Sequence, residues 1–210
     1  MRKRTHLIAS LLLPIVALML ANSMGYAQTI FQKDQNAPAL GGETTIGNSS
    51  VVVRTVTGTV DVNKRYLNLM DDIYRNELIK TFDDSATEIT FLDETTLTLG
   101  PDTSIVLDRF IYDPDKTTNE FVISVTQGVF RFATGTMQNE AYKVRTPVAT
   151  IGIRGTVIEV AVEKMTGGKG VASVELRVLE GEAYLTPCNG ERIVVLQGST
   201  AAFGPKHECP

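Results

Sequence analysis

The fold class of this chain is decided by residues 144–162, which read VRTPVATIGIRGTVIEVAV. Thr146-Pro147 predicts extended backbone, because proline fixes φ, lacks an N–H and biases the residue before it away from the helical region. Two glycines then flank Arg154, and the residues that follow are dense in Val and Ile. Branched residues at this density are typical of a strand that packs on at least one face.

Short alternations of apolar and polar residues, with turn residues between them, fill most of the remaining chain. We predict strands at residues 51–62, 78–82, 87–92, 95–99, 104–110, 120–126, 128–133, 157–162, 172–179, 183–186, 191–196 and 199–203. Residues 65–73 fit either a helical turn or a loop. A spacing of about 8 to 12 residues between turn signals is typical of all-β domains. The sequence therefore predicts one all-β domain at residues 51–203, a twisted β-sandwich or solenoid-like roll of short, mostly antiparallel strands.

The opening stretch resembles the FecR domain, a periplasmic β module known from bacterial iron-transport signalling. The residues that carry the resemblance are Thr146-Pro147-Val148-Ala149-Thr150, Ile153-Arg154-Gly155-Thr156, Phe91-Leu92-Asp93 and Gly128-Val129-Phe130-Arg131-Phe132. In the signalling members of that family, a cytoplasmic anti-sigma segment precedes one membrane span, and the periplasmic module meets a receptor's signalling domain. The resemblance implies the fold, whereas the role has to be argued from a site.

Two details refine the expected connections between strands. Glu94 stands where the family usually has a glycine after Asp93. A type I′ hairpin turn favours positive φ at both central residues, so a type I or wider turn is predicted here instead. Gly58, Gly128 and Gly181 each open a Gly-x-apolar-x-apolar pattern, and we predict them at tight turns or close approaches of the backbone.

Residues 1–27 have the features of a secretory signal. Three basic residues precede an apolar run, and small residues follow up to Ala27, where cleavage is predicted. Residues 28–50 are polar and aperiodic, which predicts a flexible leader, and residues 204–210 are predicted as a C-terminal tail. The expected location is the periplasm or the cell exterior, with no membrane span after cleavage. An uncleaved membrane anchor is the alternative.

The predicted exported chain is acidic. It loses three of the 20 Lys and Arg with the signal and keeps all 24 Asp and Glu, so its formal net charge is −7. Nucleic acids and anionic membranes favour clustered positive charge in the proteins that bind them. The composition therefore argues against either of them as a partner.

Both cysteines, Cys188 and Cys209, lie in the part predicted to be exported, where oxidation is expected. A disulfide between them would close a loop of about 20 residues and contribute roughly 3 kcal/mol in the loop-entropy model. Two free thiols are the alternative. A structural zinc site is not favoured, because His207 alone does not complete four ligands.

The sequence does not favour an enzyme. Its two histidines are His6, inside the signal, and His207, near the C-terminus, so neither a Ser–His–Asp arrangement nor a histidine-lined metal pocket is expected. The glycines around Arg154 precede a strand rather than a helix, so a phosphate-binding loop is not expected. We predict no cofactor and no metal.

Acidic pairs offer the remaining route to chemistry, and each of them lies in a turn-like context. The pairs are Asp71-Asp72, Asp83-Asp84 and Asp93-Glu94. Turn formation is the favoured interpretation over a glycosidase pair, because Asp hydrogen-bonds its own backbone in turns. Calcium binding at Asp113-Pro114-Asp115 is not favoured, because this segment lacks the glycine and the regular ligand positions of an EF-hand loop.

Arg154 has two interpretations. In the first, its guanidinium caps carbonyls or pairs with a carboxylate inside the fold, which predicts that Arg154→Lys destabilises the domain. In the second, it is an exposed anchor for a partner.

The leading functional hypothesis is a non-catalytic exported module that binds or scaffolds at the periplasm or cell surface. Its partner would be a protein or polysaccharide of the envelope, met through sheet edges and loops. The alternative is an accessory of a FecR-type transmembrane signalling system for iron uptake or sigma-factor regulation, held by an uncleaved N-terminal anchor. A third hypothesis, an enzyme acting on polysaccharide, would need two carboxylates that converge in a groove.

Overall fold

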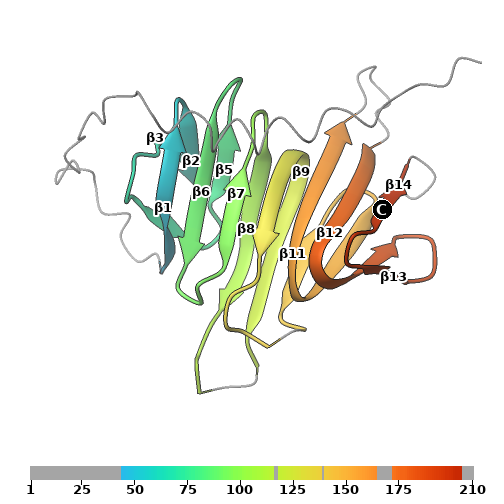
Figure 1. The fold of residues 1–210 in the computed structure, drawn as a ribbon. Coiled ribbons are helices and arrows are strands. Elements are labelled where there is room, and N and C mark those ends of the chain that lie inside the picture. Colours follow the sequence, from blue (N-terminus) through green and yellow to red (C-terminus); the bar gives the residue numbers. More distant parts are fainter. Residues whose placement is uncertain (1–43, 116–117, 139, 165–171, 205–210) are drawn as a thin grey trace, which may run out of the picture. The chain divides into compact units, whose positions relative to one another are not determined.

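A computed structural model describes residues 44–115, 118–138, 140–164 and 172–204 (Figure 1). None of these residues is helical, and no helix that could cross a membrane occurs among them. The strands are β1 (Thr45–Val53), β2 (Val56–Val60), β3 (Asn63–Tyr66), β4 (Asp72–Tyr74), β5 (Leu78–Thr81), β6 (Ala86–Phe91), β7 (Thr96–Leu99), β8 (Ser104–Ile111), β9 (Glu120–Ala133), β10 (Tyr142–Arg145), β11 (Ala149–Lys164), β12 (Ala172–Pro187), β13 (Ile193–Leu196) and β14 (Thr200–Phe203). The predicted signal, residues 28–43 of the predicted leader and residues 205–210 of the predicted C-terminal tail lie outside the described residues.

All the strands belong to one sheet. Its main path runs β13-β12-β11-β10-β9-β7-β6-β1-β4, with β14 beside β12 and a branch from β9 through β8, β5 and β2 to β3. Every pair is antiparallel except β9 with β10. The predicted all-β, mostly antiparallel single domain is confirmed, although β9, β11 and β12 are longer than the short strands expected.

Strand β9 divides the sheet into two branches. Its first half pairs with β8 and its last residues pair with β7. Gly128 stands at the change with a φ of 110°, and a Cβ there would lie 2.3 Å from the Cα of Thr103, so only glycine fits. Apolar side chains of both branches, such as Ile79 of β5 and Ile89 of β6, belong to one buried core.

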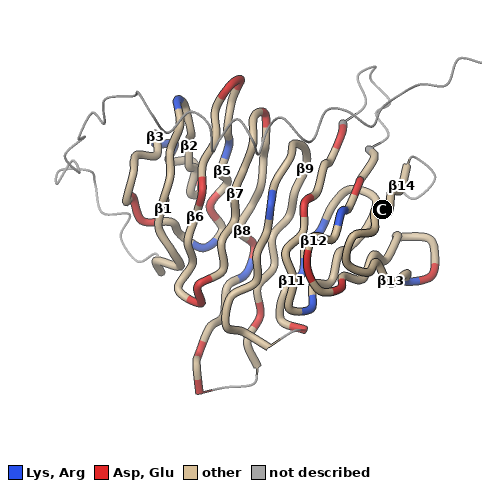
Figure 2. Tube along the Cα trace, viewed as in Figure 1, with Lys and Arg blue, Asp and Glu red and all other residues tan. Residues whose placement is uncertain are grey.

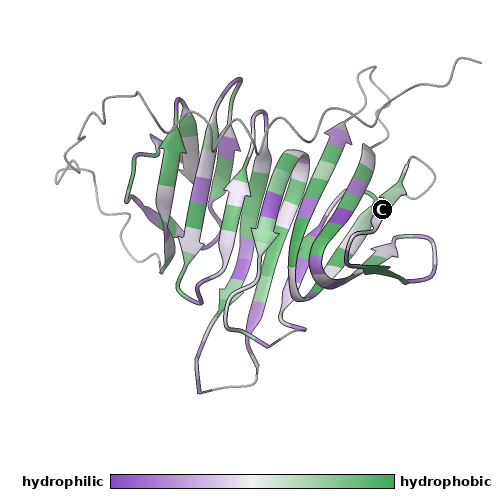
Figure 3. Cartoon of the chain, viewed as in Figure 1, coloured by the Kyte–Doolittle hydropathy of each residue, from purple (hydrophilic) through white to green (hydrophobic). Residues whose placement is uncertain are grey.

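Aromatic side chains fill the centre of this core, and apolar residues alternate with polar ones along the strands (Figure 3). The ring of Phe121 lies 4.6 Å from that of Phe91, 5.2 Å from Phe110, 5.5 Å from Phe132 and 6.2 Å from Tyr142, measured between centroids. Edge-on and tilted contacts at these distances are the favoured geometry for aromatic pairs. The five rings come from β6, β8, β9 and β10, so they join both branches.

The N-terminal boundary of the fold differs from the prediction. β1 begins at Thr45, so the last residues of the predicted flexible leader are strand. Apart from the buried Ile46 and one glycine they are polar, and backbone pairing with β4 and β6 holds them in place. Ser49 is fully buried, and its hydroxyl accepts the N–H of Asp71 at 3.0 Å. Hydrophobic periodicity does not reveal a strand that is fixed in this way.

The predicted strand at residues 51–62 is also wrong in one respect. It consists of the end of β1 and all of β2, separated at Arg54, whose φ of 58° interrupts the extended backbone. The ambiguous residues 65–73 contain no helix and include parts of β3 and β4.

Two other predicted breaks are absent. The predicted strands at 120–126 and 128–133 form the single strand β9, and those at 172–179 and 183–186 form the single strand β12. In each case a glycine with positive φ bends the strand without ending it. Glycine as a bend and glycine as a turn have the same appearance in sequence.

The hairpin between β6 and β7 has the predicted turn. The N–H of Glu94 donates to the carbonyl of Phe91 at 3.0 Å, and the N–H of Phe91 donates to the carbonyl of Thr95 at 2.9 Å. Glu94 has a φ of 67°, whereas Asp93 has no positive φ. This is a type I turn followed by one left-handed residue, which differs from the two-residue type I′ turn.

A buried ion pair fixes the start of β5. The Glu77 side chain is fully buried and lies 2.9 Å from Nη2 of Arg65, which belongs to β3. Its carboxylate also accepts the N–H of Tyr74 at 3.0 Å. Removing one member of a buried pair leaves the other charge without compensation, which destabilises strongly.

We predict that Glu77→Ala lowers the free energy of unfolding by about 2 to 3 kcal/mol, at the low end for a buried pair because Arg65 keeps some solvent contact. The control is Asp84→Asn, which removes the charge from an ion pair of similar length, 3.1 Å between Asp84 and Arg54, whose side chains are 76% and 64% exposed. Asparagine tolerates the positive φ of 53° at this position. That change should lower the same free energy by less than about 0.5 kcal/mol. Urea unfolding measures both, and equal losses would contradict the assignment.

Candidate functional site

The residues of the opening stretch build a corner in the long β11–β12 hairpin. The two strands pair along their whole length, with a register shift between Arg154 and Val157. At the shift, Gly155 has a φ of 55° and Gly181 has a φ of 75°. A Cβ on Gly181 would lie 2.4 Å from the carbonyl oxygen of Gly155. Both strands therefore bend together at a contact between backbones that leaves no room for a side chain.

Thr156, the residue after Gly155, makes hydrogen bonds on both sides of the corner. Its N–H donates to Oγ1 of Thr134 at 3.0 Å, and its hydroxyl donates to the carbonyl of Glu180. The corner is thus joined to the segment that follows β9 and to β12.

Thr146 and Pro147 form the turn between β10 and β11. The N–H and the hydroxyl of Thr146 both donate to the carbonyl of Ala149, at 2.9 and 2.8 Å, and Oγ1 accepts the N–H of Ala149 at 3.1 Å. The N–H of Cys188 donates to the carbonyl of Val148 at 3.2 Å, which joins this turn to the end of β12. The turn is closed by its own threonine, so Pro147 at its second position needs no N–H.

Asp93 is fully buried and holds the β6–β7 hairpin against the segment after β9. Its carboxylate accepts the hydroxyls of Thr95 at 2.6 Å and Tyr142 at 2.9 Å. The carbonyl of Asp93 accepts the N–H of Thr136 at 2.8 Å. Burial is the main cause that raises the pKa of Tyr142, so its hydroxyl remains a donor. Asp93 therefore has a structural role, because its hydrogen bonds join the β6–β7 hairpin to β10 and to the segment after β9.

Of the other acidic pairs, Asp83-Asp84 lies in a turn, whereas Asp72 begins β4, so the turn interpretation does not hold for Asp71-Asp72. Figure 2 shows many of the Asp and Glu residues in turns. Asp84 and Asp102 have positive φ values of 53° and 52°. The side chain of Asp113 accepts the N–H of Asp115 at 3.1 Å, as in an Asx turn. Within the described ranges, no three His, Cys, Asp or Glu side chains converge on a metal site.

Arg154 lies on the surface, so the interpretation that placed it inside the fold is wrong. Its side chain is 53% exposed and pairs with Glu182 at 3.3 Å. The side chain points outward because Ile151 and Ile153 occupy the buried face of β11, and the face alternates along a strand. The carboxylate partner was foreseen, but the buried environment was not. Arg154→Lys is accordingly expected to leave the melting temperature unchanged.

Tyr184 and Arg192 complete a polar cluster around Arg154, and sequence reasoning missed both. The hydroxyl of Tyr184 donates to Glu182 at 2.8 Å and accepts from Arg154 at 3.4 Å. The guanidinium of Arg192 lies 4.8 Å from the centre of the Tyr184 ring. Tyr184 lies opposite Gly152 of β11 and Val194 of β13, and Glu182 lies opposite Arg154. This register places the side chains of Arg154, Glu182 and Tyr184 on one face of the sheet.

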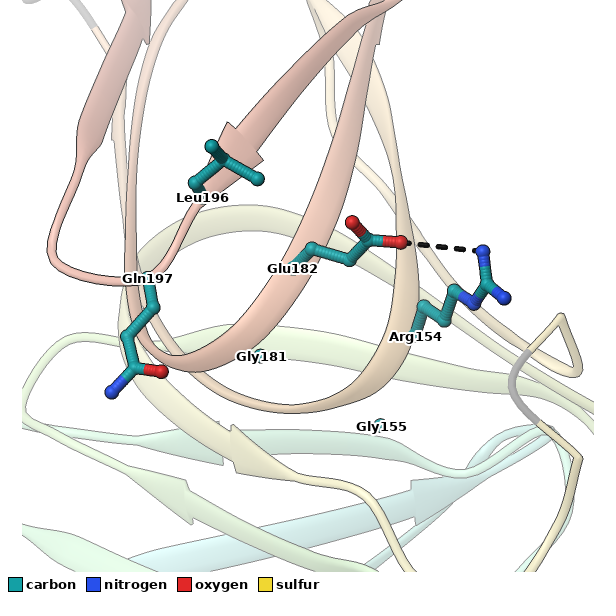
Figure 4. A pocket seen from close by; sticks show the side chains of 6 residues that line it. All are labelled: Arg154, Gly155, Gly181, Glu182, Leu196 and Gln197. Atoms are coloured by element: carbon teal, nitrogen blue, oxygen red, sulfur yellow. Dashed lines mark hydrogen bonds and ion pairs between the residues drawn. The ribbon is translucent and has the colours of Figure 1, made fainter.

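A shallow hollow of about 470 Å³ lies beside this cluster (Figure 4). It is lined by Arg154, Gly155, Gly181, Glu182, Leu196 and Gln197. The two glycines open the hollow because they have no side chains, Leu196 provides an apolar wall, and the ion pair provides a charged rim. The lining presents donors, acceptors and one apolar surface, and such a combination suits recognition of a side chain.

A family model matches the part of the chain that contains the corner. The family model described as FecR protein matches residues 77–184, which is more than half of the chain. The chain belongs to the FecR family. The matched region of this FecR-family chain runs from the buried Glu77 to Tyr184 at the corner, so it includes Asp93, Gly128, Arg154 and both corner glycines.

Two solved structures resemble the FecR-family fold described here. Both are crystal structures of a candidate anti-sigma factor from Parabacteroides distasonis ATCC 8503, at 1.65 and 2.50 Å resolution. They are 15% and 16% identical in sequence, with TM-scores of 0.48 and 0.47. Each alignment covers 62% of this chain and 56% of the other, so the match spans just over half the length of those proteins. No curated protein matches the chain.

One of the two cysteines lies within the described residues. Cys188 directly follows β12 and is not a free thiol, whereas Cys209 lies outside the described residues. The predicted bridge between them therefore remains a prediction.

We predict that Gly181→Ala destabilises the FecR domain far more than Gly198→Ala. Both glycines have left-handed backbones, with φ values of 75° and 78°, but a Cβ on Gly198 would meet no atom within 4 Å. The control should lose about 1 kcal/mol from backbone strain alone. Gly181→Ala should lose about 1 to 3 kcal/mol more through overpacking. Thermal and urea unfolding of both variants measure the difference, and equal losses would show that the corner contact is unimportant.

Proposed function

We propose that this FecR-family protein is a non-catalytic binding module of the bacterial envelope, and that it engages a protein partner at the β11–β12 corner. The observation that carries the proposal is the exposed Arg154–Glu182 pair at the rim of the hollow. The pair lies on the structural corner of the family motif, where rigid backbone positions both charges. Preorganised charged groups of this kind provide specificity and orientation in protein–protein contacts.

A protein suits this surface better than a polysaccharide. Sugar recognition on a sheet commonly uses an open aromatic face, whereas Arg192 lies over the ring of Tyr184. A guanidinium, a carboxylate and the apolar Leu196 side by side match the mixed chemistry of a protein side chain. The partner's contact residue is expected to carry both an apolar stem and a charged or polar end.

The proposed location is the periplasm or the cell exterior, reached through the signal-like residues 1–27. The alternative is a signalling accessory that keeps this segment as a membrane anchor. Intact-mass measurement of the protein purified from cells separates the two. A mature N-terminus near Gln28 supports the free module, and a retained N-terminus supports the anchored accessory.

We predict that Glu182→Arg abolishes partner capture while the fold is kept. Reversal of the charge places two guanidinium groups side by side at the rim, so an oriented salt bridge to the partner is lost. The measurement is cross-linking of envelope extracts followed by mapping of the cross-links onto β12. The control is Glu163→Arg, an exposed reversal near the far end of β11. Capture by Glu182→Arg at the wild-type level would place the partner elsewhere.

A further inference from the structure

Strand β13 is an unusually apolar edge. It pairs with β12 on one side, and among the described residues no strand lies on its other side. Its four residues, Ile193, Val194, Val195 and Leu196, carry no charge. Only Val195 is buried, whereas Ile193, Val194 and Leu196 are 40%, 53% and 59% exposed.

The other edges of the described sheet are protected or less apolar. β3 contains Lys64 and Arg65, and β4 is three residues long and begins with Asp72. β14 is uncharged, but its one large side chain, Phe203, packs against the core. Charges and short length are the usual devices that keep an edge from pairing with another chain. β13 is four residues long, one more than β4, but it has no charge, no proline and no bulge.

We propose that β13 is a dimerisation edge, which pairs antiparallel with β13 of a second copy of this chain across a two-fold axis. This axis stands perpendicular to the joined sheet, so a side chain on one face of the sheet in the first copy lies on the same face in the second copy. Val194 and Leu196 lie on one face of the sheet, where their neighbours across the strand pair are Tyr184 and Glu182 of β12. In the dimer these two residues from each copy form one apolar cluster.

The charges at the ends of β13 favour a second copy as the occupant. In an antiparallel pair, the start of one strand lies beside the end of the other, so Arg192 of one copy comes next to Leu196 and Gln197 of its partner. Leu196 and Gln197 line the hollow together with the carboxylate of Glu182. Arg192 has no carboxylate partner among the described residues; its described contact is with the Tyr184 ring. Self-pairing therefore brings a cation to a carboxylate and places no like charges face to face.

The dimer extends the sheet through backbone hydrogen bonds, with the apolar cluster as its centre. Backbone pairing supplies the affinity in strand addition, and side-chain pockets supply the selectivity. Leu196 and Glu182 belong to both surfaces, so a second copy and the envelope partner proposed above would compete for this edge. The test uses purified protein alone, so its outcome does not depend on that partner.

The test is sedimentation equilibrium of the purified full chain over a range from low micromolar to submillimolar concentration. The wild-type protein is expected to form a reversible dimer. Val194→Lys and Val194→Glu should each be monomeric, because the two-fold axis brings like charges together. An equimolar mixture of the two variants should restore a dimer, which separates self-pairing from misfolding. Circular dichroism spectra and melting temperatures confirm that each variant is folded.

The control is Val62→Lys, which changes an apolar residue that is 91% exposed and lies in the turn after β2. This variant should dimerise like the wild type. A wild-type chain that stays monomeric over the whole range would overturn the proposal. So would a dimer that survives Val194→Lys, or a mixture of the two charged variants that stays monomeric.

Discussion

The rest of the structure depends on one contact between backbones, where Gly181 of β12 approaches the carbonyl of Gly155 in β11 so closely that a Cβ would lie 2.4 Å from that oxygen. The bend at this contact lets a single pair of strands serve two parts of the sheet. Before the bend β11 pairs with β10, and after it β11 pairs with β9. A straight hairpin of the same length would extend past the core on one side and bury fewer of its Val and Ile residues.

Buried polar groups determine how the shorter strands attach to this frame. Asp93 and Glu77 are both fully buried, yet each binds donors from other segments through its carboxylate. Such groups are weak evidence for stability, because an apolar pair of the same shape often does as well. Their hydrogen bonds are directional, however, and they are satisfied by one arrangement of the turns only. The apolar core stabilises the sheet, whereas these carboxylates select its register at two places.

The sequence was sufficient for the fold class and insufficient for the position of the site. Alternating Val and Ile residues correctly indicate strands, whereas Thr146-Pro147, for which extended backbone is predicted, forms the turn before β11. The same alternation would also have placed Arg154 on the face opposite Ile153, but its glycine neighbours suggested a buried cap instead. β13 shows the opposite limit, because four consecutive apolar residues have the same pattern in a core strand as in an exposed edge. Only the pairing partners distinguish the two, and those partners lie far away in sequence.

The hollow lies at the C-terminal boundary of the region that the family model matches. The matched family region ends at Tyr184, which lies on the near side of the hollow. Leu196 and Gln197 form the other wall and lie beyond that region. The conformation of the corner is fixed by glycines that contribute no side chain, so changes in the far wall leave the bend intact. A change of side chain at Leu196 or Gln197 would therefore alter the wall of the hollow without altering the bend, and β13 is the part of that segment that pairs with the corner.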